Sequence, residues 1–184
     1  MIPAEIVRLD SSRLPALSDF LHGLPERDLT FIKEDVTDPE ILQRWCHESG
    51  GVGAARRWVA VDDAGVLALV MVVPLRGWSS HVGELRLVVD PAARRQGLGA
   101  LLARHALREA ADMGLQKVVV EMVAEQTGAA QMFSDLGFRG EALLTCQIRD
   151  RGGELRDLLV LAHDVGEEWS TIASIGVEDE IGSG

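Results

Sequence analysis

Between residues 84 and 113 the spacing of hydrophobic positions changes from two residues to between three and four. Every second residue from Leu85 to Val89 is apolar, which is typical of a half-buried strand. Pro91 would end this strand, because proline has no backbone N–H for the sheet and restricts the residue before it. From Leu98 to Met113 the apolar positions have helical spacing, and Gly114 is a favourable residue at a helix end. The segment predicts a strand, a short loop and a helix.

The same patterns assign elements to most of the remaining chain. Before residue 84 they predict a strand at 5–10, helices at 14–23 and 39–48, and a hairpin with strands at 57–61 and 66–73. A polar loop at 24–38 separates the two helices, and a glycine-rich break at 49–53 follows the second. After residue 114 they predict a strand at 117–123, a short helix at 127–136, and a hairpin with strands at 138–149 and 154–163. The strand at 66–73 is apolar on both faces, so we expect it near the centre of the sheet.

The chain has 184 residues, which fits one domain. We assign this domain to residues 1–165. Seven acidic residues and no lysine or arginine follow Arg156. The segment 166–184 is polar and contains glycine, so we expect a mobile acidic tail there.

The net charge of −11 argues against nucleic acid and anionic membrane as partners. No apolar run approaches the roughly 20 residues that span a bilayer, and the first residues show no signal-peptide pattern. Cys46 and Cys146 are too far apart in sequence to form a metal motif, so we interpret them as reduced thiols in the core. We therefore expect a cytoplasmic protein that is a monomer or a homodimer and has no metal site.

The loop between the strand and the helix, Arg94 to Gly99, favours anion binding. Gly97 and Gly99 would let a ligand approach the backbone, and the first amides of a helix have no intrahelical partner. The helix dipole adds roughly half a positive charge there, and phosphate is the usual ligand of such a turn. The alternative is a plain helix start with two small residues beside a solvated arginine pair. The loop lacks the third glycine of the dinucleotide fingerprint and the Lys-Ser/Thr ending of the P-loop.

The sequence Val89-Asp90-Pro91 followed by Arg94-Arg95-Gln96-Gly97-Leu98-Gly99 resembles the acyl-CoA pyrophosphate loop of the GCN5-related N-acetyltransferases, the GNAT family. The resemblance covers roughly residues 55–165. It implies a single mixed α/β (α+β) sheet with helices on both faces, in the order βααβββαβαββ that the patterns predict. It also implies acetyl-CoA as the acyl donor, held between the strands at 84–89 and 117–123.

The family resemblance assigns roles to individual residues. The backbone of Leu87, Val88 and Val89 would pair with the pantetheine arm as an added strand, and an N–H of Val88 or Val89 would polarise the thioester carbonyl. The residues expected to contact the cofactor are Leu87, Val88, Val89, Arg94, Arg95, Gln96, Gly97, Leu98, Gly99, Ala100, Gln126 and Phe133. Glu121 is the candidate general base, and Glu84 acting through a water is the alternative. Where the family has a tyrosine that donates a proton to the leaving thiolate, this chain has Phe133, and it contains no tyrosine.

The sequence says least about the acceptor substrate. In the family the acceptor enters between the first two helices and the final hairpin. Here that region holds aromatic and acidic residues, namely Phe31, Glu34, Asp35, Asp38, Trp45 and Trp78. An acidic rim would suit a cationic amine, although a solvated run of charges is the alternative. We expect N-acetylation of a primary amine, with a small molecule favoured over a protein N-terminus or lysine. The competing hypothesis is a catalytically weak acyl-CoA-binding or regulatory module.

Overall fold

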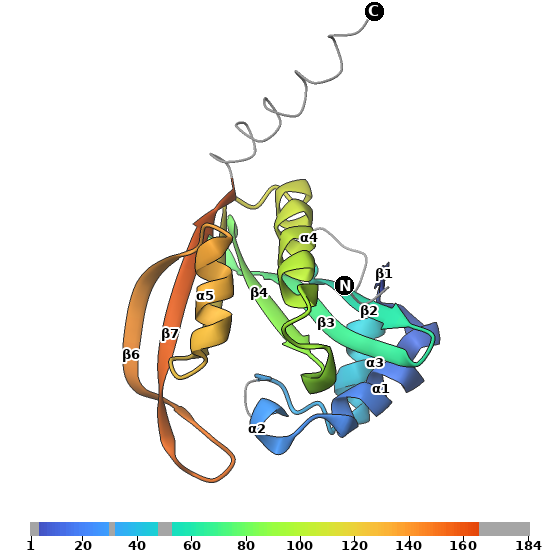
Figure 1. Ribbon diagram of the computed structural model, residues 1–184. Coiled ribbons are helices and arrows are strands. Elements are labelled where there is room, and N and C mark those ends of the chain that lie inside the picture. The colour runs from blue at the N-terminus through green and yellow to red at the C-terminus, as the bar shows by residue number, and fades with distance from the viewer. Residues whose placement is uncertain (1–3, 30–31, 48–52, 166–184) are drawn as a thin grey trace, which may run out of the picture.

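A computed structural model describes residues 4–29, 32–47 and 53–165 (Figure 1). In these ranges the first two strands are separated by a 3₁₀ turn (Ser11–Arg13) and three α-helical segments, α1 (Leu14–Gly23), α2 (Glu26–Leu29) and α3 (Pro39–His47). Two longer connections contain α4 (Leu98–Asp112) and α5 (Thr127–Asp135). The strands are β1 (Glu5–Arg8), β2 (Arg56–Asp62), β3 (Gly65–Pro74), β4 (Val82–Val89), β5 (Lys117–Val123), β6 (Arg139–Arg149) and β7 (Leu155–Asp164).

The strands form one mixed sheet in the order β1-β2-β3-β4-β5-β7-β6. All neighbours are antiparallel except β4 and β5, which are parallel. The apolar strand β3 lies between β2 and β4 with both faces covered, as its sequence predicted. The predicted α/β fold and mixed sheet are therefore confirmed.

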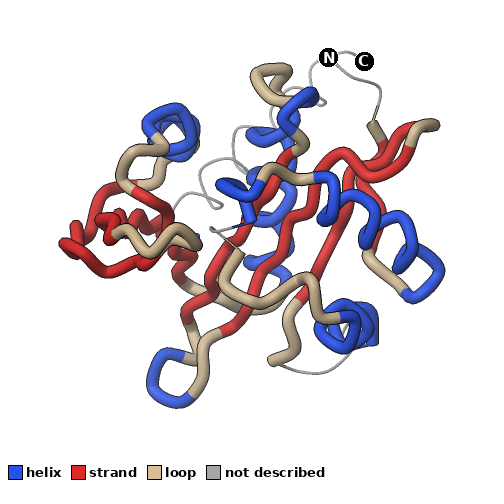
Figure 2. The backbone as a smooth tube through the Cα atoms, turned by 90° about the horizontal axis from the view of Figure 1, so that it is seen from below, coloured by secondary structure: helices blue, strands red, loops and turns tan. Residues whose placement is uncertain are grey.

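Helices cover both faces of this sheet (Figure 2). On one face α4 and α5 pack over a core that includes Leu85, Leu102 and Phe133. On the other face α1 and α3 pack over a second core that includes Leu17 and Trp45. Successive strand residues point to opposite faces of a sheet. Because Leu85 belongs to the core under α4 and α5, its neighbours Glu84 and Arg86 point toward the side of α1 and α3. Glu121 lies on that side as well, because its neighbours Val120 and Met122 belong to the core under α4 and α5.

The sheet opens between β4 and β5. The two strands pair only at Val82 with Lys117, Gly83 with Val118, and Glu84 with Val119. Beyond this point β4 continues beside β3 (Figure 1). The other strand, β5, continues beside β7. The two halves of the sheet therefore diverge at the end of β4 that leads into α4.

Three sequence predictions need correction. The loop predicted at 24–38 contains the single α-helical turn α2, which is too short for a periodic signal. In the described residues three α-helical segments rather than two therefore follow β1. The first strand ends at Arg8 rather than at residue 10. Cys46 is buried, but Cys146 is exposed on β6, so it is not a core thiol. Residues 49–52 of the predicted break and the tail at 166–184 lie outside the described residues.

Candidate acyl-CoA and amine site

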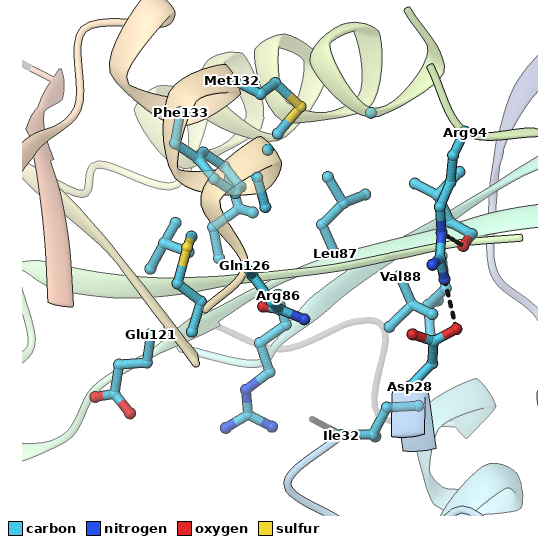
Figure 3. A pocket seen from close by; sticks show the side chains of 18 of the residues that line it. Asp28, Ile32, Arg86, Leu87, Val88, Arg94, Glu121, Gln126, Met132 and Phe133 are labelled. Carbon is cyan, nitrogen blue, oxygen red and sulfur yellow. Dashed lines mark hydrogen bonds and ion pairs between the residues drawn. The ribbon is translucent and has the colours of Figure 1, made fainter. Parts of the chain in front are cut away.

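A cavity of about 590 Å³ occupies the opening between β4 and β5 (Figure 3). This volume lies within the range of roughly 300–1,000 Å³ that small-molecule and cofactor sites usually have. All residues that the sequence assigned to the cofactor line the cavity except Gln96 and Leu98. Both candidate bases, Glu84 and Glu121, also line it. The fold thus brings the proposed donor and acceptor groups into one space.

The loop before α4 has the backbone conformation of an anion cradle. Gly97 is the N-cap of α4 with φ of 84°, and its position provides no side-chain cap for the first amides of the helix. Arg95 also has a positive φ, 59°, which is uncommon for a residue with a side chain. Such a conformation costs about 1–2 kcal/mol and is enriched at functional sites. Gly97, Gly99 and Ala100 line the cavity, so the start of α4 forms part of its wall.

Gly99 lies close to side chains that line the cavity from two other elements. A Cβ atom at this position would lie 3.1 Å from the Met132 Sδ and 3.7 Å from a Leu87 methyl carbon. The Met132 side chain comes from α5 and Leu87 from β4, as Figure 3 shows. A larger residue at position 99 would therefore push into the space between the two elements.

Arg94 connects this loop to the opposite side of the cavity. Its Nε donates to the Val89 carbonyl at 3.0 Å, and an Nη lies 2.6 Å from the Asp28 carboxylate of α2. Figure 3 shows the Arg94 side chain reaching down to Asp28. The guanidinium is therefore held at the mouth of the cavity, between the end of β4 and α2.

Two residues of the predicted set lie elsewhere. Leu98 is buried in the core under α4. The exposed Gln96 side chain donates to the Ala92 carbonyl at 3.1 Å, which folds it back onto its own loop. Gln96 and Leu98 are thus placed to shape the turn rather than to line the cavity.

Both candidate bases form an ion pair with the same ammonium group, that of Lys33. Lys33 Nζ lies 2.7 Å from a Glu84 oxygen and 2.6 Å from a Glu121 oxygen. Lys33 belongs to the connection between α2 and α3, so this contact joins three distant parts of the chain. The fold therefore places two carboxylates where they bind a primary ammonium inside the cavity.

Glu84 has further partners that fix its charge. Arg86 donates to Glu84 at 2.9 Å and to both oxygens of Glu34 at 2.7 and 2.8 Å. Burial of Glu84, whose side chain is 7% exposed, would raise its pKa. The hydrogen bonds and charges of Arg86 and Lys33 outweigh that effect, so the pKa of Glu84 lies below its ordinary value. Glu84 is consequently held as an anion, which suits binding a cation better than accepting a proton.

Replacing Glu84 with glutamine should lower the free energy of unfolding at pH 7 by about 2 kcal/mol, because charged hydrogen bonds are lost. A lowered pKa in the folded state contributes stability above the ordinary carboxyl pKa of about 4.3, and this is lost as pH falls through the lower folded value. The deficit measured by urea unfolding should therefore shrink at about pH 3. The exposed Glu141→Gln variant, which loses only a surface ion pair, is the control. An equal deficit at both pH values would assign the effect to packing.

Phe133 closes the cavity on the side of α5. Its ring is buried and meets the Phe138 ring edge-on, with centroids 5.1 Å apart. In Figure 3 Phe133 and Met132 lie on one side of the strand, and Glu121 and Arg86 lie on the other. Gln126, the N-cap residue of α5, also lines the cavity and makes no side-chain capping bond. The α5 wall is therefore largely apolar, with Gln126 and Thr127 as its polar residues.

The predicted acceptor region is only partly at the cavity. Glu34 lines it, whereas Trp45 is buried in the core and Trp78 is 97% exposed outside it. The other two acidic residues cap local turns, since Asp35 accepts from Thr37 and Asp38 from the Glu40 amide. Phe31 lies outside the described residues. Sequence reasoning missed the basic partners Lys33 and Arg86 and the acidic Asp28. The only available signal for Lys33 was that lysine occurs just twice in the chain.

The chain belongs to the acetyltransferase (GNAT) family, because the sequence profile of that family matches residues 19–138. The predicted family is therefore confirmed. The rat protein N-acetyltransferase 8F1 is 30% identical over 133 residues, which are 68% of this chain and 57% of the rat protein. The chain thus matches a little over half the length of that relative.

Solved structures share the fold at low sequence identity. The yncA protein of Salmonella typhimurium, solved with its cofactor acetyl-CoA, has a TM-score of 0.76 at 17% identity, over 89% of this chain and 95% of that one. Spermidine N-acetyltransferase of Vibrio cholerae, in complex with CoA and spermine, has a TM-score of 0.73 at 16% identity, over 88% and 95%. In the ranges that the structure describes, no helix has the length and apolar character needed to cross a membrane.

Proposed function

We propose that the protein transfers the acetyl group of acetyl-CoA to the primary amine of a small cationic molecule. The observation that carries this proposal is the carboxylate pair Glu84 and Glu121, which holds an ammonium group in the same cavity as the glycine loop before α4. Family membership and the acetyltransferases of similar fold support the acyl transfer. A protein N-terminus or a lysine side chain is the less favoured acceptor, because no peptide groove was evident in the sequence.

The donor would bind along the open edge of β4. From Leu85 to Val88 the described strands provide no partner on the β5 side, so the N–H and C=O groups there that point away from β3 can pair with an extended ligand. The first amides of α4 and the side chain of Arg95 would hold the pyrophosphate. Acetyl-CoA, when bound, supplies an activated thioester, and an N–H of Val88 or Val89 would polarise its carbonyl.

The acceptor would bind from the side of α1 and α2. Glu84, kept ionised by Arg86, would orient the ammonium group. Glu121 is the proposed base, since its side chain is 31% exposed and can return the proton to water. Direct attack by the neutral amine on the thioester carbonyl would then release CoA as a thiolate.

The proton for the thiolate would come from water. Phe133 cannot donate one, and the chain has no tyrosine. Water suffices because a thiol has a pKa of only about 8.5 and its thiolate is a good leaving group. The same feature favours the second candidate function, a module that binds acyl-CoA and turns it over weakly.

A panel of primary amines separates the two functions. The full chain is mixed with acetyl-CoA and diamines, polyamines, amino-acid amides and N-terminal peptides, and the free thiol is followed over time. We expect acetylation that is fastest with small amines carrying a second cationic group. If CoA binds stoichiometrically but no amine gives thiol release above the uncatalysed rate, the proposed enzyme activity is rejected in favour of the acyl-CoA-binding module.

A further inference from the structure

We propose, on the basis of the proposed function, that Lys33 is an internal acceptor, so that the protein acetylates its own Lys33 when no amine is bound. Lys33 Nζ lies within 2.7 Å of both carboxylates that would bind the acceptor amine. The lysine is thus a primary amine of this chain that occupies the proposed acceptor position. It lines the same cavity as Val88, Gly97 and Gly99.

The surroundings of Lys33 allow it to reach a bound donor. Its side chain is 41% exposed and extends from a connection without regular secondary structure, whereas the Glu84 carboxylate is almost fully buried. The two anions therefore attract the ammonium group into the cavity, while the stem of the lysine stays free to shift. An external amine would compete for the same two carboxylates.

The transfer balances without any further reactant. Glu121 accepts a proton from the Lys33 ammonium, and the neutral Nζ forms a bond to the carbonyl carbon of the thioester. The carbon–sulfur bond breaks with its electron pair going to sulfur. Of the two protons that the nitrogen loses, one ends on the CoA thiol, delivered by water, and the other leaves through Glu121 to solvent. The products are Nε-acetyl-lysine and CoA.

Acetylation of Lys33 would change the acceptor site. The amide has no positive charge, so both ion pairs of Lys33 are lost. The acetyl group would also remain in the space that an external amine needs. The modified protein should therefore acetylate external amines at least about tenfold more slowly.

The chain contains two lysines, so acetylation of Lys33 can be compared with acetylation of one other lysine side chain. Lys117 is the other lysine of the sequence, and it serves as a matched control because it also pairs with a carboxylate, that of Glu141, at 2.5 Å. It begins β5, four residues before Glu121, which is about 13 Å along an extended strand. Unlike Lys33, it is not among the residues that line the cavity.

The experiment incubates the full chain with isotopically labelled acetyl-CoA and no amine, followed by intact mass and peptide mapping. We expect one acetyl group on Lys33, formed at a first-order rate that does not depend on protein concentration. Saturating amine from the panel should suppress it. The label should disappear in Lys33→Arg and persist in Lys117→Arg. In Glu121→Gln the rate should fall by at least about tenfold.

Each remaining outcome overturns a specific statement. Turnover of external amines with Lys33 unlabelled would remove the internal acceptor and leave the proposed function intact. Equal labelling of Lys33 and Lys117, or undiminished labelling of Lys33 in urea-unfolded protein, would show uncatalysed acetylation and also remove it. Labelling of neither Lys33 nor any amine would remove both proposals.

Discussion

Turnover of an external amine should fall about 100-fold when Glu121 is replaced by glutamine, while the affinity for acetyl-CoA stays unchanged. Glutamine keeps the size of the side chain and one hydrogen bond to Lys33, but it cannot accept the proton of the acceptor ammonium. The defect should shrink as pH rises toward the pKa of the amine, about 10, because more amine then arrives neutral. Steady-state assays from about pH 6 to about pH 9 and calorimetry with acetyl-CoA measure the two effects.

Glu141→Gln is the matched control for this prediction. Glu141 also pairs with a lysine, Lys117, but it lies on the exposed strand β6 outside the cavity. Its replacement should leave turnover within about twofold of the wild type. If the Glu121 variant matches the wild type over the whole pH range, Glu121 is structural, and Glu84 with a water becomes the base to test.

The second large effect concerns the loop before α4. Gly99→Val should weaken CoA binding about 100-fold, which corresponds to about 2.7 kcal/mol. A Cβ at position 99 already approaches Met132 to 3.1 Å, and two further methyl groups would enter the cavity between Leu87 and Met132. Gly97→Ala should weaken binding too, because alanine resists the φ of 84° and would move the first amides of α4. Calorimetry with CoA gives the affinities.

Gly114→Ala separates loss of binding from loss of stability. Gly114 follows α4 with φ of 75° and has open space around it, like Gly97, but it does not line the cavity. Both alanine variants should lose about 1–2 kcal/mol of stability, and only Gly97→Ala should lose CoA affinity. Unchanged affinity in both Gly97→Ala and Gly99→Val would exclude the loop as the pyrophosphate site.

Local patterns predicted the elements that form the site. The helical spacing that begins at Leu98 predicted the start of α4, and the valine-rich run at 117–123 predicted both ends of β5. These signals are strong because each element buries one face against a core, which imposes its period on the sequence. Ten of the twelve residues that the family resemblance assigned to the cofactor line the cavity, because they lie on β4, on the loop before α4 and on α4 and α5, which surround the opening of the sheet.

What the sequence could not show depends on contacts between distant segments. The ion pair of Lys33 and Glu121 joins residues 88 positions apart, and no local pattern carries that information. The helix α2 has only four residues, so it shows no periodicity, yet it supplies the Asp28 that holds Arg94. Cys146 was misplaced because β6 is an edge strand that is exposed along most of its length.

The short pairing of β4 with β5 divides the sheet into two sections that are weakly joined. Only three residue pairs of the described strands join a four-stranded section, β1 to β4, to a three-stranded section, β5 to β7. Such a seam can open locally at a lower free energy than the whole fold, so the amide hydrogens that join residues 82–84 to residues 117–119 would exchange with solvent early. A ligand that adds its own hydrogen bonds to the open edge of β4 would act as the missing strand. The two sections of the sheet would then move together rather than independently.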